Sequence, residues 1–367
     1  MKNKLAVVIA VGLVLTVSLS GCVFTATEDE GPFLPGPSEV KELVREVSGI
    51  RSLSISADGN RMIYVAFTDP ANERIYLVIR DARNGRALQL YEHTNIRAAS
   101  WGPDSASFTY LDEAEGEQKR TIGVMAEQAL AMEGVVDLML YDMVSGPAWS
   151  PDGRFVAFWS RKNLNEETAQ TALWLVRPDG SDLRTLYGGS NAKTIGTITG
   201  NLTWSPDTSQ LLFTMGKGNA VNAFVMERRG GEPKNLTSNY LKVSDLSWSP
   251  SGKKIAYAAI ERERPEVSPK IGVMNTDGSG KTLLGPSGWP VGWIPNSGEL
   301  AYLSFDGDIK TPRVSRRLEA VNVRTRAVRL LAEVEEDTII AAATSSDSRV
   351  FFVTADEQGI GQIMVVE

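Results

Sequence analysis

Cysteine and histidine are almost absent from this sequence, whose 367 residues include one Cys, Cys22, and one His, His93. A single Cys excludes an intramolecular disulfide and a Cys-rich zinc site. A Ser-His-Asp triad would have to use His93, but this residue follows a predicted outer strand, and the chain contains no G-x-S-x-G nucleophile motif. We therefore expect no catalytic triad and no peptidase activity.

A concentrated basic run is also missing. The chain has 38 Lys and Arg residues against 45 Asp and Glu residues, which gives a formal net charge of −7. Binding to nucleic acid depends on basic faces that contact phosphate groups. We therefore expect no nucleic-acid partner.

Long apolar runs are absent except near the N-terminus, where residues 5–19 lie between two Lys residues and Ser20-Gly21-Cys22. The run is short for a membrane span, and its basic start and small-residue end are typical of a signal peptide. A Cys directly after small residues resembles the bacterial lipobox, in which the Cys is acylated, for example with palmitate, and becomes the first mature residue. We predict a lipoprotein signal peptide over 1–21 and lipidation at Cys22. The alternative is a buried Cys in an uncleaved signal anchor.

Lipidation at Cys22 would place the protein outside the cytoplasm, anchored to the cell membrane or the outer membrane of a bacterium. Residues 22–38 are polar, acidic and rich in Pro and Gly, and they show no periodicity. This composition is typical of a flexible tether. The rest of the chain, 39–367, is predicted to fold as one repeat domain.

The repeat domain is organised around the phrase WSPDGRFVAFWS, residues 149–160. Pro-Asp-Gly is typical of a tight turn, and the alternation of apolar residues after it predicts a strand. Copies of the phrase begin at Ile55, Trp101, Trp149, Trp204, Trp248, Trp293 and Thr344, so their turns recur every 44 to 55 residues. A repeat of this length that holds several short strands is typical of a propeller blade.

The sequence therefore predicts an all-β, seven-bladed β-propeller of four-stranded antiparallel blades, with six and eight as alternative counts. The last copy ends one strand short, and 40–47 aligns with 327–334, which precedes the last copy. We predict that this N-terminal strand closes the last blade, since an open ring would expose a strand edge. In the second copy, 125–132 fits a short helix as well as a strand.

The repeated phrase WSPDG followed by a strand resembles the WD40-like Pro-Asp repeat of the TolB-like β-propeller family. The resemblance covers residues 50–367 and is specific for the fold. Members of this family include periplasmic translocation accessories, cell-surface binding proteins and the propeller domains of peptidases. Because one fold hosts many functions, the resemblance implies a fold more than a function.

Two residue types recur within the phrase. The turn carboxylates could form a carboxylate array, but each is expected to lock its own hairpin, since Ser251 and Asn296 occupy equivalent positions and would make the same local bond. The recurring tryptophans could form a ligand platform, but their constant spacing favours packing between blades. These structural residues are Trp101, Asp104, Trp149, Asp152, Trp204, Asp207, Trp248 and Trp293.

The sequence favours a binding scaffold that presents a ring face to an envelope protein, peptide or glycan, without a cofactor, a metal or catalytic residues. Loops of variable length are expected to carry recognition, and the candidates are 161–171, 188–200, 261–270 and 305–316. The alternative is a hydrolase or lyase that acts on an envelope glycan or small ester through a metal and loop carboxylates, with Glu166, Glu167, Asp306 and Asp308 as candidates. A third hypothesis is a small-molecule sensor.

Overall fold

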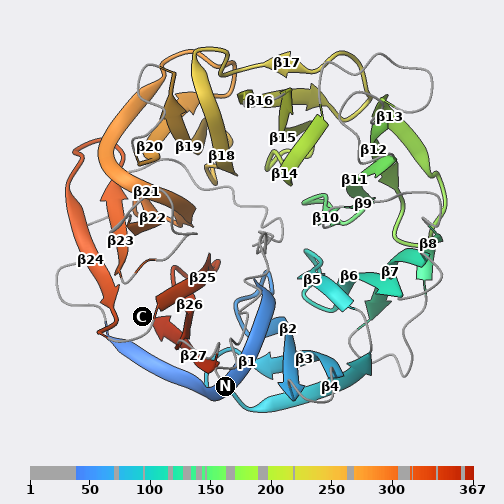
Figure 1. Ribbon diagram of the computed structural model, residues 1–367, viewed down its shortest axis with the longest axis vertical. Helices are drawn as coiled ribbons and strands as arrows, with labels where there is room; N and C mark the ends of the chain where they lie inside the picture. The colour runs from blue at the N-terminus through green and yellow to red at the C-terminus, as the bar shows by residue number, and fades with distance from the viewer. Residues whose placement is uncertain are drawn as a thin grey trace, which may run out of the picture.

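The computed structural model describes residues 39–69, 74–93, 96–114, 119–126, 134–137, 143–144, 147–162, 170–188, 197–217, 220–262, 268–304, 315, 317–335, 338–356 and 360–367. In this part of the chain the strands pair into antiparallel sheets that follow one another around a ring, apart from one parallel bridge between Val221 and Lys242 (Figure 1). Among the described residues, none forms a helix that is long and apolar enough to cross a membrane. The predicted all-β propeller is confirmed.

We number the blades along the chain and give the strands of each blade in order from the ring axis outwards. Blade one consists of β1 (Val40–Ile55), β2 (Arg61–Asp69), β3 (Arg74–Asp81) and β4 (Ala87–His93). Blade two consists of β5 (Ile96–Trp101), β6 (Ser107–Ala114), β7 (Lys119–Ala126) and β8 (Gly134–Asp137). Blade three consists of β10 (Ala148–Trp149), β11 (Val156–Lys162), β12 (Gln170–Val176) and β13 (Arg184–Gly188), while β9 (Met143–Val144) also pairs with β11. Blade four consists of β14 (Thr197–Trp204), β15 (Gln210–Lys217), β16 (Ala220–Glu227) and β17 (Lys234–Asn235).

Two long strands are shared between neighbouring blades. Blade five consists of β18 (Tyr240–Trp248), β19 (Lys254–Glu261), β20 (Lys270–Asn275) and the first part of β21 (Thr282–Ile294). Blade six consists of the second part of β21, β22 (Glu299–Ser304), β23 (Arg317–Asn322) and β24 (Val328–Glu333). Blade seven consists of β25 (Thr338–Thr344), β26 (Val350–Ala355), β27 (Ile360–Val366) and the first part of β1. The described strands therefore form seven blades, as predicted.

The core of the molecule lies between the blades rather than at the ring axis. The buried apolar residues form seven clusters within the described part of the chain, and each cluster joins two neighbouring blades. In β11, for example, Val156 and Phe158 pack toward blade two, whereas Ala157 and Trp159 pack toward blade four. Successive side chains of a strand point to opposite faces of the sheet. Both faces of a blade are covered, which explains why the second strands are almost continuously apolar.

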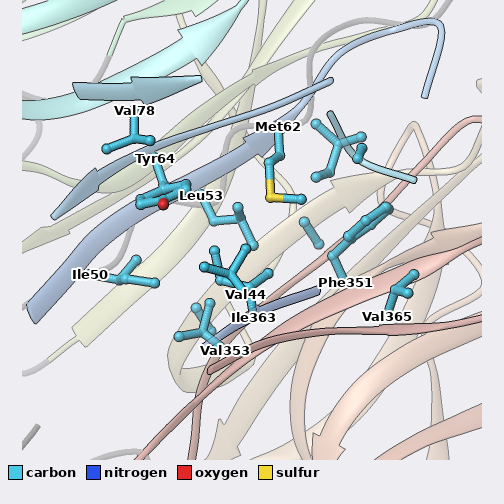
Figure 2. Close-up of a cluster of buried hydrophobic side chains, with 14 of the residues drawn as sticks. Val44, Ile50, Leu53, Met62, Tyr64, Val78, Phe351, Val353, Ile363 and Val365 are labelled. Carbon is cyan, nitrogen blue, oxygen red and sulfur yellow. The ribbon is translucent and has the colours of Figure 1, made fainter. Parts of the chain in front are cut away.

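The ring is closed by the first part of β1, which pairs antiparallel with β27 from Val40 opposite Val366 to Ser48 opposite Ile360. The second part of β1 then pairs with β2 in blade one. Behind the pairing lies a buried cluster, which we name the closure cluster (Figure 2). Its labelled members are Val44, Ile50, Leu53, Met62, Tyr64 and Val78 from β1, β2 and β3, and Phe351, Val353, Ile363 and Val365 from β26 and β27. The predicted closure by the N-terminal strand is confirmed.

Arg349 makes a second connection between the last blade and the first. Its guanidinium donates to the carbonyl oxygens of Ala82, at 3.0 Å, and of Gly59 in blade one. The same group contacts the Asp347 carboxylate at 2.8 Å and lies 5.1 Å above the centre of the Phe351 ring. One side chain therefore links backbone, carboxylate and aromatic groups on both sides of the closure.

The structure of blade two answers only in part whether 125–132 forms a helix or a strand. Met125 and Ala126 continue β7, which pairs with β6 from Ser107 opposite Ala126 to Ala114 opposite Lys119. Residues 127–132 lie outside the described residues. The outer strand of this blade is β8, which pairs with β7 at Thr121 to Gly123.

Candidate functional site: the two faces of the ring

Strand direction assigns every connection to one of two faces of the ring. Consecutive strands of a blade are antiparallel, so the connections from first to second strand and from third to fourth strand share one face, which we name the turn face. Neighbouring hairpins touch there: the Asp58 N–H donates to the Ser105 hydroxyl at 2.9 Å, and the Ser348 hydroxyl donates to the Pro295 carbonyl at 3.0 Å. The connections from second to third strand and from one blade to the next leave the opposite face, the loop face.

The Pro-Asp hairpin is held by its own side chains. In blade three the Ser150 hydroxyl donates to Asp152 at 2.6 Å and accepts from the Phe155 N–H at 3.0 Å, while the Arg154 N–H donates to Asp152 at 3.1 Å. The same Ser-to-Asp bond occurs at 2.6 Å in blade four, from Ser205 to Asp207. Further copies join Ser56 to Asp58 and Ser345 to Asp347.

Three blades build this hairpin differently. In blade five Ser251 replaces the Asp, and its hydroxyl makes the predicted local bond with the Ser249 hydroxyl at 3.1 Å. Blade two has Gly102 in place of the Ser, and Asp104 instead accepts from the N–H groups of Ala106 and Ser107 at 3.0 and 2.9 Å. In blade six the Ser297 hydroxyl donates to the Ile294 carbonyl at 2.9 Å and accepts from the Glu299 N–H at 3.1 Å. The prediction that Asn296 makes the local bond was wrong, because the hydroxyl of the next residue supplies it.

Hydrogen bonding lowers the pKa of most of these carboxylates. Burial alone raises the pKa of Asp207, but hydrogen bonds from Ser205 and Ser209 outweigh burial, and the pKa lies below its ordinary value. The pKa values of Asp58 and Asp104 are lowered for the same balance of reasons. In Asp347 the Arg349 side chain adds to the lowering. Each of these groups therefore favours its charged form in the folded protein.

Acid should weaken the fold through these turns. A carboxylate whose pKa is lower in the folded than in the unfolded chain stabilises the fold above its unfolded pKa, about 4, and loses this contribution as the pH falls through the folded pKa. We expect Asp207→Asn to lower the free energy of unfolding by about 1 kcal/mol at pH 7 and to flatten the decline of the melting temperature below about pH 4. Melting curves from pH 7 to pH 2 test this, and equal slopes for both proteins would contradict it.

The recurring tryptophans lie at the end of the innermost strands, and each belongs to the cluster shared with the preceding blade. Trp204 Nε1 donates to the Ala148 carbonyl of blade three at 3.0 Å, and Trp293 Nε1 donates to the Ser247 carbonyl of blade five at 3.3 Å. Within the described part of the chain, the buried Nε1 atoms of Trp101, Trp149 and Trp248 have no partner. All five tryptophans thus occupy the same position in their blades, but only two of the five indoles donate a hydrogen bond to the preceding blade.

This difference gives a matched pair of substitutions. Trp204→Phe removes both packing area and a hydrogen bond, whereas Trp149→Phe removes packing area alone. We expect Trp204→Phe to cost about 1 kcal/mol more than Trp149→Phe in the free energy of unfolding, because the Ala148 carbonyl loses its donor. Chemical denaturation of the two variants measures the difference, which would vanish if the indole bond contributed nothing.

An innermost strand also carries a residue that sequence reasoning missed. Asp245 in β18 lies at a bulge with φ 54°, in the left-handed region, and the Ser244 hydroxyl donates to its carboxylate at 2.6 Å. The corresponding bulge in β14 has Gly200 with φ 77°, whose carbonyl accepts from Trp159 Nε1 at 3.0 Å. Left-handed non-glycine residues gather at functional sites. No fixed spacing signals this residue, since the bulge lies three residues before Trp248 but four before Trp204.

The predicted recognition loops share one face. The segments 161–171, 261–270 and 305–316 connect second to third strands, and 188–200 connects blade three to blade four, so all four leave the loop face. Lys162 and Gln170 pair with each other at the base of the first loop. Cys22, Glu166, Glu167, Asp306 and Asp308 lie outside the described residues. His93 is the last residue of β4, also at the loop face.

Among the described residues, no group of three or more His, Cys, Asp and Glu side chains could hold a metal ion. The turn aspartates face their own hairpins rather than one another, and the tryptophans are buried between blades. What the described structure offers for binding is therefore two broad surfaces, the turn face and the loop face.

A closed ring of seven four-stranded antiparallel blades, with Pro-Asp hairpins between their first two strands, defines a β-propeller. This chain belongs to the family of TolB β-propeller domains, which it matches over residues 44–289. It is 29% identical over 238 residues to the Tol-Pal system protein TolB of Anaeromyxobacter dehalogenans, covering 60% of this chain and 50% of that protein. It is 30% identical over 122 residues to the uncharacterized peptidase YuxL of Bacillus subtilis, covering 32% of this chain and 18% of that protein. The chain thus spans half or less of these curated relatives.

Solved structures show the same fold at low sequence identity. The oligogalacturonate lyase of Vibrio parahaemolyticus is similar with a TM-score of 0.70 and 12% identity, covering 90% of this chain and 93% of that chain. The β-propeller domain of the Trilobed protease from Pyrococcus furiosus is similar with a TM-score of 0.62 and 11% identity, covering 88% and 96%. These similarities establish the fold and carry no activity to this chain.

Proposed function

We propose that this protein is a binding scaffold of the bacterial cell envelope, anchored by a lipid at Cys22, that presents its loop face to a protein, peptide or glycan. The observation that carries the proposal is topological: all four connections of variable length leave the same face of a closed ring. Recognition residues commonly lie on loops that a rigid frame positions. Seven clusters between blades and a closed ring supply that frame.

Membership of the TolB propeller family supports the cell-envelope setting. The TolB relative is named as a protein of the Tol-Pal system, and the leader that ends in Ser20-Gly21-Cys22 supports export followed by lipidation. Mass spectrometry of the protein isolated from membranes tests the anchor directly. An acylated Cys22 at the mature N-terminus supports it, and an unmodified thiol on an uncleaved chain rejects it.

The loop face is tested by replacing each long connection with a short Gly-Ser turn and cross-linking the variants to neighbours in intact cells. Replacement of 229–232, an exposed hairpin of the turn face in blade four, is the control. We expect one or more of the loop replacements to lose a partner that the control keeps, with melting temperatures showing that the ring is intact. Retention of every partner by all four loop variants would reject the loop face as the recognition surface.

The enzyme alternative was predicted from the loop carboxylates Glu166, Glu167, Asp306 and Asp308, and the structure adds one candidate, Asp245, whose backbone lies in the left-handed region in an innermost strand. It predicts a bound divalent metal in the purified protein and turnover of an envelope glycan or ester that Asp245→Asn abolishes. A catalytically silent protein that recovers an envelope partner favours the scaffold.

A further inference from the structure

The outermost strand of blade six, β24, lies at the edge of its sheet. It pairs antiparallel with β23, from Val321 opposite Val328 to Arg317 opposite Glu333. In the described part of the chain no strand pairs with its other edge, where the sheet ends. Figure 1 shows β24 running along the rim of the ring, with β23 on its inner side. The edge of such a strand presents backbone donors and acceptors to which another strand can pair.

Two large apolar side chains of β24 are exposed. Val328 and Leu330 are 48% and 49% exposed, and they lie two residues apart, on the same side of the strand. Each of the other outermost strands has at most one such side chain among its described residues, for example Leu90 in β4. Single exposed apolar residues are ordinary on a protein surface, whereas adjacent ones indicate a contact surface.

The residue between these two is charged but turned away from them. Arg329 lies on the other side of the strand, where its guanidinium donates to the Glu299 carboxylate at 2.8 Å. The Arg329 side chain is 20% exposed and that of Glu299 is 9% exposed, so this pair of charges is largely buried. The exposed charges of β24 are therefore found at its two ends.

The two ends of β24 carry opposite charges. Arg324 and Arg326 precede its first residue, whereas Glu333 and Glu335 lie at and just beyond its last residue, and all four are exposed. When two copies of one strand pair in antiparallel order, the basic start of each lies beside the acidic end of the other. In parallel order like charges would meet, which is unfavourable. The charge pattern of β24 therefore matches a second copy of the same strand.

We propose that two copies of this protein associate through β24, which pairs antiparallel with β24 of the second copy about a two-fold axis at Arg329. Val328 of each copy then lies opposite Leu330 of the other, so that the exposed apolar side chains cover one another. The two Arg329 side chains stay bound to Glu299 of their own copies. In this arrangement the sheet of blade six continues into the sheet of the second copy.

The position of β24 determines how the two rings face. Because β24 runs along the rim (Figure 1), a two-fold axis perpendicular to the joined sheet is roughly parallel to the ring axis. The two rings therefore lie side by side, with their loop faces on the same side. This arrangement lets both copies present the same surface in one direction.

The association is expected to be weak. One strand from each copy gives a contact smaller than the roughly 1,000 Å² typical of stable complexes. Two copies held in one membrane would meet at a raised effective concentration, which favours such a contact. Only this last step depends on the proposed lipid at Cys22, so loss of the anchor and loss of the dimer are separate outcomes.

Analytical ultracentrifugation of residues 22–367 with Cys22→Ser tests the pairing without an acyl group or a disulfide. We expect a monomer–dimer equilibrium with a Kd of about 100 µM, which Leu330→Lys weakens about tenfold or more. The control is Leu90→Lys, which changes an exposed leucine on the outermost strand of blade one and should alter the Kd by less than about twofold. A monomer at about 500 µM would overturn the proposal and leave β24 to a different partner. Equal effects of the two substitutions would overturn it as well.

Exchanging the charges at the ends of β24 tests the antiparallel order. Arg326→Glu places like charges together at both ends of the contact, and so does Glu335→Arg, so each should weaken the dimer about threefold or more at low salt. The double variant should associate as the parent does, and so should an equimolar mixture of the two single variants, because each supplies the charge that the other lacks. Melting curves show that the variants are folded. If neither the double variant nor the mixture recovers association, β24 does not pair with a second copy in this order.

Discussion

Deletion of residues 39–48 is expected to lower the melting temperature of this propeller by more than about 10 °C. These residues form the strand that pairs with β27 over the length of blade seven and close the ring. Without them β27 becomes an edge with unpaired backbone groups, and blade seven is held to blade one only by side chains. Calorimetry measures the shift, and a melting temperature within about 2 °C of the parent would contradict a stabilising closure.

Two substitutions in β1 separate the stability that comes from side-chain packing in the closure cluster from the stability that comes from pairing with β27. Val44 is 6% exposed in the closure cluster, whereas Val40 is 41% exposed on the outer side of the ring. We expect Val44→Asp to cost about 4 kcal/mol in the free energy of unfolding, since it buries a charge without a partner. Val40→Asp should cost about 0.5 kcal/mol or less. Similar costs for both variants would show that the cluster does not hold the ring closed.

The sequence predicted the blades well because the information for each blade is local. A Ser-Pro-Asp phrase closes its hairpin through bonds within five residues, such as Ser150 to Asp152 and Phe155 to Ser150. The closing strand could be found as well, because 40–47 resembles the outer strand β24 in both pattern and place. A repeat protein exposes such relations, since one sequence holds several versions of the same element.

Features that depend on neighbouring blades were not visible in the sequence. Trp149 and Trp204 occupy the same position of the phrase, yet only the second indole has a partner. Which side of the ring carries the long loops follows from strand direction around a closed circle, and a single blade does not reveal it.

Irregularities within single strands and hairpins were also not predicted from the sequence. Asp245 occupies a bulge whose distance from the next Trp changes between blades, so that alignment on the Trp misses it. The hairpin of blade six likewise moves its side-chain bond from Asn296 to Ser297. In both cases the position of a local irregularity or of a side-chain hydrogen bond changes between blades although the phrase around it recurs.

Gly272→Ala is expected to cost about 3 kcal/mol in the free energy of unfolding, although the change adds a single methyl group. Gly272 in β20 pairs with Tyr257 in β19, and the tyrosine ring lies over the glycine. A Cβ atom at Gly272 would lie 2.5 Å from Cζ and 2.6 Å from Cε2 of that ring. The ring has little room to move, since Tyr257 is fully buried and its hydroxyl lies 3.2 Å from that of Tyr240.

At the same register position other blades pair different residues, and these pairs indicate that steric contact with the tyrosine ring is the reason for glycine at position 272. Blade two repeats the arrangement with Tyr110 over Gly123, where a Cβ atom would lie 2.0 Å from the ring. Blades three and four instead pair two aromatic rings, Phe158 with Trp174 and Phe213 with Phe224, whose centres are 6.3 Å apart. A large residue opposite the aromatic residue of the second strand is therefore tolerated where the two aromatic rings stack side by side. It is not tolerated where a tyrosine ring covers the backbone of the third strand.

Two controls make the prediction specific to this contact. Gly285→Ala adds a methyl group at a glycine with φ 108° and no atom within 4 Å of its new Cβ, so it measures backbone strain alone, about 1 kcal/mol. In a Tyr257→Leu background the ring is gone, and Gly272→Ala should then cost less than about 1 kcal/mol. Denaturant titrations of the four proteins test the cycle. If Gly272→Ala costs the same in both backgrounds, the tyrosine ring does not determine the residue opposite it, and the backbone of β20 itself must require glycine.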